Sequence, residues 1–173
     1  MNFSIEKSIS ILERTPAVMH ELLFDLPEEW IMFNEGDETW SPYDIVGHLI
    51  HGESSDWIKR LEIILSDFTD KKFTPFDRFA QFNESKGKKM NTLLNEFKIL
   101  RKKNIEILKS KNITDIDFER EGIHPVFGIV TLRNLIATWA VHDLNHLAQI
   151  YRVMAHQYKS EVGPWKEYLR ILK

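Results

Sequence analysis

Apolar residues recur at helical intervals along most of this chain, and strand signals are weak throughout. The periodicity predicts four long helices, and a short fifth helix is expected near the end of the chain over residues 164–172. Four long amphipathic helices with one domain's worth of core favour an all-α four-helix bundle. The four long helices are predicted near residues 3–24, 42–66, 84–110 and 131–157.

Proline marks two of the predicted helix starts. Pro16 is expected to kink the first helix or to begin a second segment capped by Thr15, because proline is tolerated only in the first turn. Ser41 and Pro42 have the residue types of an N-cap and a first helical position. Residues 68–83 and 112–129 are rich in phenylalanine, glycine or proline, and are predicted to be loops.

Length and composition limit the classes of protein to which this chain can belong. The 173 residues contain no repeat or long linker, so residues 1–173 are expected to form a single domain. A net charge of -3 gives no electrostatic case for binding nucleic acid or a membrane surface. The apolar runs are too short to span a membrane, and the first ten residues lack the apolar core of a signal peptide. We therefore expect a cytoplasmic protein.

The chain contains no cysteine. This excludes disulfides, cysteine-ligated zinc and a cysteine nucleophile of its own. Thiol chemistry would need a thiol brought in as a substrate, and the seven histidines are the main soft metal ligands available.

His142 and His146 lie four residues apart in the last long predicted helix, so both imidazoles project from one side of it. Histidine is a common ligand of zinc, nickel, copper and iron. Asp143 falls inside the apolar arc, and His146 lies at the edge of a narrow polar stripe. The stripe is either a solvated face or an inward polar patch, and periodicity leaves both readings open. It consists of Asn134, Thr138, His142, Asn145, Gln149 and Arg152.

The second predicted helix offers a third ligand, His48, two turns after its start. Gly52 lies one turn further and would leave space beside the imidazole. Asp44, one turn earlier, could orient the His48 ring through its second nitrogen. His51 could also face the site, although a partly exposed position is the simpler reading. Three neutral histidines leave at least one coordination position of a metal open.

The sequence around the remaining histidines says less about their roles. His124 precedes the last long helix and could reach the mouth of a pocket. His20 and His156 are expected at the surface or at a rim.

Several motifs together resemble the DinB-like superfamily. Segment 40–49 (WSPYDIVGHL) is similar to its first metal-ligand motif, and segment 142–150 (HDLNHLAQI) to its second. Segments 14–16, 122–125 and 163–169 are also similar to many members, in the right order along the chain. The resemblance implies an up-down-down-up bundle and one divalent metal ion, zinc, nickel or iron, held by His48, His142 and His146.

The family resemblance also implies a range of functions. Some members transfer or isomerise substrates with low-molecular-weight thiols such as bacillithiol or mycothiol, and others have no known activity. Our leading hypothesis is a metal-dependent thiol S-transferase that binds a small-molecule substrate and a thiol, and that forms a homodimer. The alternatives are a metal-dependent hydrolase, with Asp44 or Asp143 as a candidate catalytic base, and a non-catalytic metal-binding stress-associated protein.

Overall fold

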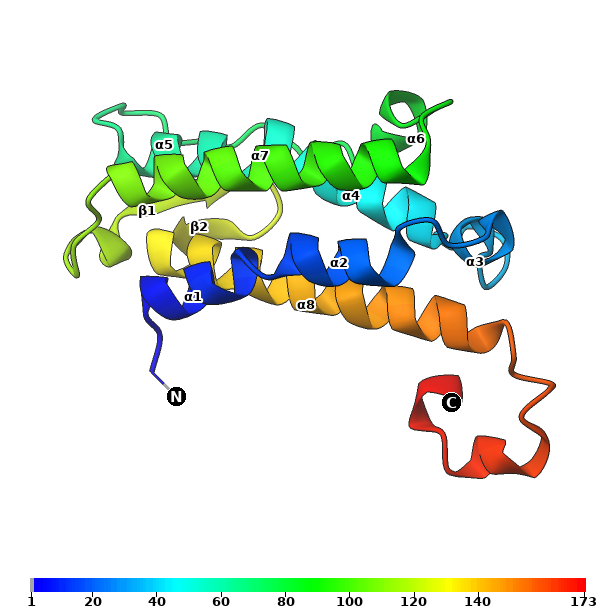
Figure 1. The fold of residues 1–173 in the computed structure, drawn as a ribbon. Coiled ribbons are helices and arrows are strands. Elements are labelled where there is room, and N and C mark those ends of the chain that lie inside the picture. Colours follow the sequence, from blue (N-terminus) through cyan, green and yellow to red (C-terminus); the bar gives the residue numbers. More distant parts are fainter. Residues whose placement is uncertain (1) are drawn as a thin grey trace.

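Four helical columns lie side by side in the structure, a computed structural model that describes residues 2–173 (Figure 1). The first and fourth columns run in one direction and the second and third in the other, so the bundle is up-down-down-up. This confirms the predicted fold. The columns are α1 (Ile5–Leu12) with α2 (Thr15–Leu23), α4 (Pro42–Ser55) with α5 (Trp57–Leu65), α7 (Met90–Ser110), and α8 (Leu132–His156).

Two of the predicted long helices are each divided in two. Pro16 lies in the first turn of α2, and Thr15 is the first helical residue rather than the cap. The predicted helix 42–66 breaks at Asp56, whose φ of -122° and ψ of -71° leave the helical region. Its start is as predicted: the Ser41 side chain accepts a hydrogen bond from the Asp44 backbone, and the Asp44 carboxylate accepts one from the Ser41 backbone.

Short elements occupy the connections between the columns. The third long helix begins at Met90, six residues later than the predicted 84, because residues 81–84 form the separate turn α6 (Gln81–Glu84). Helix α3 (Glu28–Met32) precedes α4. The predicted helix 164–172 is two 3-10 turns, Gly163–Glu167 and Arg170–Leu172.

The prediction of a loop over residues 112–129 was wrong in part, because strands β1 (Glu121–His124) and β2 (Gly128–Thr131) form an antiparallel hairpin there. Each strand has only four residues, too few for a clear period of two. Gly122 allows the hairpin to approach closely, since a Cβ at this position would lie 2.5 Å from a ring atom of Phe73. Residue 123 also bridges to Lys72, which ties segment 68–83 to the hairpin.

The core consists of two apolar clusters, one toward each end of the bundle, with a buried polar layer between them. On α7 one cluster ends at Phe97 and the other begins at Ile105. Arg101 lies between them and is 1% exposed. Glu53 on α4 and Asp143 on α8 lie at the same level, again between members of the two clusters.

Arg101 holds the polar layer together. One of its terminal nitrogens donates to the Leu12 carbonyl at 2.9 Å and to Asp143, and the other donates to Asp143 Oδ1 at 2.9 Å and Glu53 Oε1 at 2.8 Å. Burial opposes the charge of Arg101, but the two carboxylates raise its pKa, so the guanidinium stays charged. The Leu12 carbonyl lies where α1 ends, so the break between α1 and α2 provides one acceptor of this layer.

Within residues 2–173, no helix is both long enough and apolar enough to cross a membrane.

Candidate metal centre

His48 on α4 and His142 and His146 on α8 converge beside the polar layer. The Nε2 atom of His142 lies 3.2 Å from that of His48 and 3.1 Å from that of His146. One ring nitrogen from each of the three lies within 4.8 Å of the others. The structure thus brings together the three residues that the sequence analysis selected.

This geometry fits a divalent metal ion. A tetrahedral zinc ion with nitrogen ligands at roughly 2.0–2.1 Å would set neighbouring ligand nitrogens about 3.3 Å apart. The two Nε2 separations of 3.1 and 3.2 Å are close to that spacing. When each ring carries its proton on Nδ1, the three Nε2 lone pairs face one another, an arrangement that a cation stabilises. These residues would supply three ligands to such an ion and leave the remaining coordination position to water or substrate.

A hydrogen bond and aromatic rings hold the imidazoles in place. His146 Nδ1 lies 2.9 Å from Oε1 of Gln149, so it donates its proton there and leaves Nε2 as the ligand atom. The His48 and His142 Nδ1 atoms are buried and have no hydrogen-bond partner among residues 2–173. Instead the His48 ring packs 4.8 Å from that of Trp40, and the His142 ring packs 5.2 Å from that of Trp57.

The electrostatic environment keeps the three histidines neutral. Burial, with a smaller contribution from the neighbouring His146, lowers the pKa of both His48 and His142 to about 3. Burial also lowers the pKa of His146, against the opposing effect of its hydrogen bond to Gln149. Metal ligation needs the deprotonated ring, so the site is ready to bind a cation at neutral pH.

The histidines line a cavity of about 770 Å³, which we call the histidine cavity. This is the size of a small-molecule site. Its walls come from α4, α5, α8, segment 75–78 and the tip of the β1–β2 hairpin. Besides the three histidines they include Trp40, Gly52, Asp56, Trp57, Arg60, Pro75, Phe76, Arg78, His124, Pro125, Val126, Phe127 and Asn145.

The two acidic residues considered as catalytic bases lie elsewhere. The Asp44 carboxylate accepts hydrogen bonds from the backbone and hydroxyl of Ser41, at 3.0 and 2.6 Å, and does not contact His48 Nδ1. Asp143 is fully buried against Arg101. Neither residue lines the histidine cavity. The partners of both carboxylates are structural, and the expected contact between Asp44 and the His48 ring is not formed.

Asp56 is the carboxylate that does line the histidine cavity, and the sequence analysis missed it. Burial raises its pKa to about 6, although Arg60 and His51 oppose this shift. Its Oδ1 lies 2.6 Å from Nε of Arg60. The four-residue spacing of this pair is visible in the sequence, but such pairs usually lie on a solvated surface. Nothing in the sequence shows that the hairpin covers this one.

The other histidines occupy varied positions. His124 does lie at the cavity, where its Nδ1 accepts hydrogen bonds from the backbone of Val126 and Phe127, each at 3.2 Å. His51 is buried rather than partly exposed, with Nδ1 at 3.0 Å from Glu84, and does not line the cavity. His20 and His156 lie away from it, His20 partly exposed and His156 beside Glu35.

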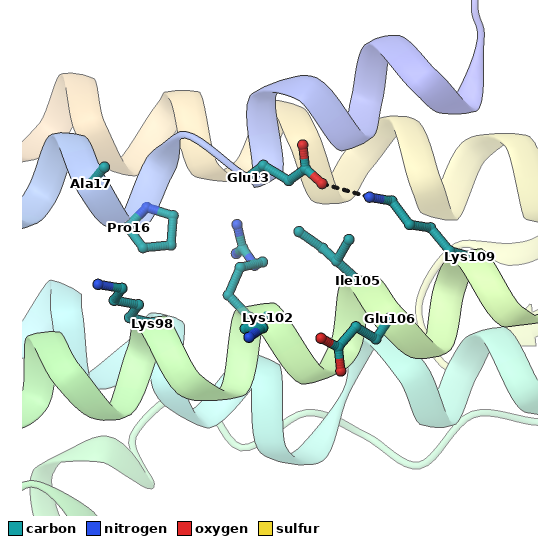
Figure 2. A pocket seen from close by; sticks show the side chains of 9 residues that line it. Glu13, Pro16, Ala17, Lys98, Lys102, Ile105, Glu106 and Lys109 are labelled. Carbon is teal, nitrogen blue, oxygen red and sulfur yellow. Dashed lines mark hydrogen bonds and ion pairs between the residues drawn. The ribbon is translucent and has the colours of Figure 1, made fainter.

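A smaller cleft of about 380 Å³ lies between α2 and α7, away from the histidines. Pro16 and Ala17 face Lys98 and Ile105 across it, and the Glu13–Lys109 pair, 2.7 Å apart, closes one end (Figure 2). Arg101 also lines this cleft, while its guanidinium is held by the polar layer. No histidine lines this cleft.

Comparisons with known proteins agree with this arrangement. Among solved structures, YfiT from Bacillus subtilis superposes with a TM-score of 0.75 over 90% of each chain, at 21% sequence identity. YfiT is described as a probable metal-dependent hydrolase with an unusual four-helix bundle topology. At this identity the likeness establishes a common fold. No curated protein sequence matches the chain. The family model of the DinB superfamily matches residues 11–150, which include all three histidines, and the chain therefore belongs to the DinB superfamily.

Proposed function

We propose that this protein is a metal-dependent enzyme that joins a low-molecular-weight thiol to an electrophilic small molecule. The observation that carries the proposal is the convergence of three histidine nitrogens on one point at the wall of a cavity of about 770 Å³. Three protein ligands leave a coordination position for a substrate, whereas structural zinc sites usually have four protein ligands. A bound divalent ion would lower the pKa of a coordinated thiol and fix its position.

The residues of the cavity suit such a reaction. The chain has no cysteine, so the attacking sulfur comes from solution and no protein thiol competes for the metal. Asp56 has a pKa of about 6, raised mainly by burial, and can accept the proton that the thiol loses. An acceptor whose pKa is near the working pH is effective in general base catalysis. Trp57, Phe76 and Phe127 provide apolar surface for the electrophile.

A hydrolase is the second candidate, and Asp56 is also the observation that favours it. The same carboxylate could take a proton from water rather than from a thiol. The description of YfiT points in this direction for that protein. The two functions differ in whether a thiol is consumed, so one assay separates them.

The test compares conjugation and hydrolysis in the same preparations. Protein loaded with zinc, nickel or iron is mixed with a panel of thiols and electrophiles, and then with esters and amides without thiol. Metal-dependent conjugation that is lost in His48→Ala and kept in His20→Ala is expected, because His20 lies outside the cavity. The catalysed rate should vary less between pH 6 and 8 than the free reaction, since a thiol of pKa about 8.5 is only a few per cent ionised at neutral pH. Hydrolysis alone would favour the second candidate, and no reaction at all would favour a non-catalytic metal-binding protein.

A further inference from the structure

The polar stripe of α8 continues beyond the metal ligands. Asn145, Gln149 and Arg152 lie on the same side of the helix as His142 and His146, at spacings of three or four residues. Of these three residues, only Gln149 forms a hydrogen bond with one of the histidines, His146. The stripe extends about 9 Å along the axis from His146 to Arg152, at 1.5 Å per residue. Metal binding alone does not account for polar residues over this length of α8.

Three adjoining hollows cover the stripe. The histidine cavity shares Trp40, Arg78, Asn145 and His146 with a second hollow of about 770 Å³. The second shares Asn145, Gln149 and Arg152 with a third of about 360 Å³, which reaches Arg170 and Lys173 at the end of the chain. We call the second and third hollows together the α8 trough. The trough runs along α8 from the histidines to the C-terminal turn. The polar stripe therefore lines a concave surface and is not an ordinary solvated helix face.

The α8 trough is cationic, although the chain as a whole has a net charge of -3. Arg78, Arg152, Arg170 and Lys173 line it, against one acidic side chain, that of Glu38. Arg152 is paired with Glu35, at 2.6 Å from its Nη2. The side chains of the other three cations form no ion pair or hydrogen bond within residues 2–173. Unpaired cations at both ends of a concave surface are complementary to an anion.

Arg78 lies where the cationic trough meets the histidine cavity. It lines both the histidine cavity and the trough, beside the point where the two meet at His146. A ligand that extends from the histidines into the trough therefore passes Arg78 first and reaches Arg152 and Arg170 further along. Asn145 lies on all three hollows and offers an amide to the polar middle of such a ligand.

We propose that the α8 trough binds an elongated cosubstrate whose far end is anionic, with Arg170 as the residue that recognises its charge. The reactive end lies at the histidines, and the negative group, carboxylate or phosphate, lies about 9 Å or more along α8. That the reactive end is a thiol rests on the proposed function. The electrophile then occupies the other side of the histidine cavity, among Phe76 and Phe127.

The test uses thiols that differ only in their anionic groups. Glutathione is compared with its diethyl ester, and 4′-phosphopantetheine with pantetheine, which separates recognition of carboxylate from that of phosphate. Binding is measured on cobalt-loaded protein by the thiolate-to-cobalt charge-transfer absorption, which needs no turnover. Each anionic probe should bind roughly tenfold more tightly than its neutralised partner, the effect of about one hydrogen bond to a charged group. The advantage should shrink as salt is added.

Single substitutions test which cation of the trough binds the anionic group of the probe. Arg170→Gln should weaken binding of the preferred anionic probe by roughly tenfold and leave its neutralised partner unchanged. Lys102→Gln is the matched control, because Lys102 is an exposed cation of α7 that lines the separate cleft. Equal affinity for charged and neutralised probes, or equal loss in the control, would overturn the proposal.

A non-coordinating probe separates this proposal from the proposed function. Titration calorimetry with S-methylglutathione measures binding that involves no thiolate. Arginine-dependent binding of this probe, with no charge-transfer band from any thiol, would support an anion-binding trough and count against a thiol transferase. Thiol binding that ignores charge would leave the transferase standing and reject the trough.

Discussion

Replacing Arg101 by methionine should destabilise the protein more than any exposed charge substitution on the same helix. The change removes the donors that the Asp143 carboxylate accepts from Arg101, and Glu53 loses the hydrogen bond at 2.8 Å. Glu53 keeps Trp139 and Asn104 as donors, each at 2.9 Å. Both carboxylates have fully buried side chains, so neither can be solvated. Removing one partner of a buried ion pair costs about 3–5 kcal/mol.

Urea and thermal unfolding at pH 7 measure this loss. For a chain of this length, 3–5 kcal/mol corresponds to a fall in Tm of roughly 6–20 °C. Lys102→Met, the neighbouring exposed residue on α7, should change stability by less than about 0.5 kcal/mol. Adding Glu53→Gln and Asp143→Asn to Arg101→Met should restore part of the stability, because no uncompensated charge then remains. An Arg101→Met variant as stable as Lys102→Met, or a triple variant less stable than the single one, would refute this reasoning.

Three further predictions concern metal, pH and assembly. His142→Ala should greatly reduce the metal content of protein purified without a nickel column, whereas His20→Ala should not, and equal contents by elemental analysis would contradict the ligand assignment. The metal-free protein should lose stability as pH falls from about 6.5 toward 3, because burial lowers the pKa of His48 and His142 to about 3 from 6.5 and protons then bind the unfolded chain more tightly. A pH-independent urea midpoint in that range would exclude this. Light scattering at micromolar concentration should show a homodimer, twice the 20.5 kDa chain mass, and a monomer alone would reject it.

The bundle could be predicted because its signals are local. The Ser41 cap, the apolar periodicity and the Pro16 break depend on residues within a turn or two of each other, and each lies close to where the pattern indicated. The break at Asp56 has no such signal. The β1–β2 hairpin was missed because its strands are short and because Phe73 and Lys72, which lie against it, are about fifty residues earlier in the chain.

The same distinction applies to the candidate site. The spacing of His142 and His146 is local, and His48 was a candidate from its position in the second predicted helix before the family motif pointed to it. The sequence was therefore enough to select all three. Lysines and arginines outside the apolar stripe of α7 have the pattern of a solvated surface, but Arg101 is buried. Nothing near residue 101 indicates that Glu53 and Asp143 meet it, because they lie 48 and 42 residues away. A cation can be recognised as buried only when its partners are known.

The polar layer and the metal site constrain each other. Asp143 directly follows the candidate ligand His142 on α8, and Glu53 follows His48 by five residues on α4. Arg101 contacts both carboxylates, so one cation on α7 connects the two helices that supply all three ligands. A rotation of α8 by one residue, about 100°, would move His142 and His146 away from His48 and would also turn Asp143 out of reach of Arg101. The ion pairs therefore penalise the same displacement that would separate the histidine nitrogens. An apolar layer could slide or rotate with much less loss, since hydrophobic contacts are non-directional.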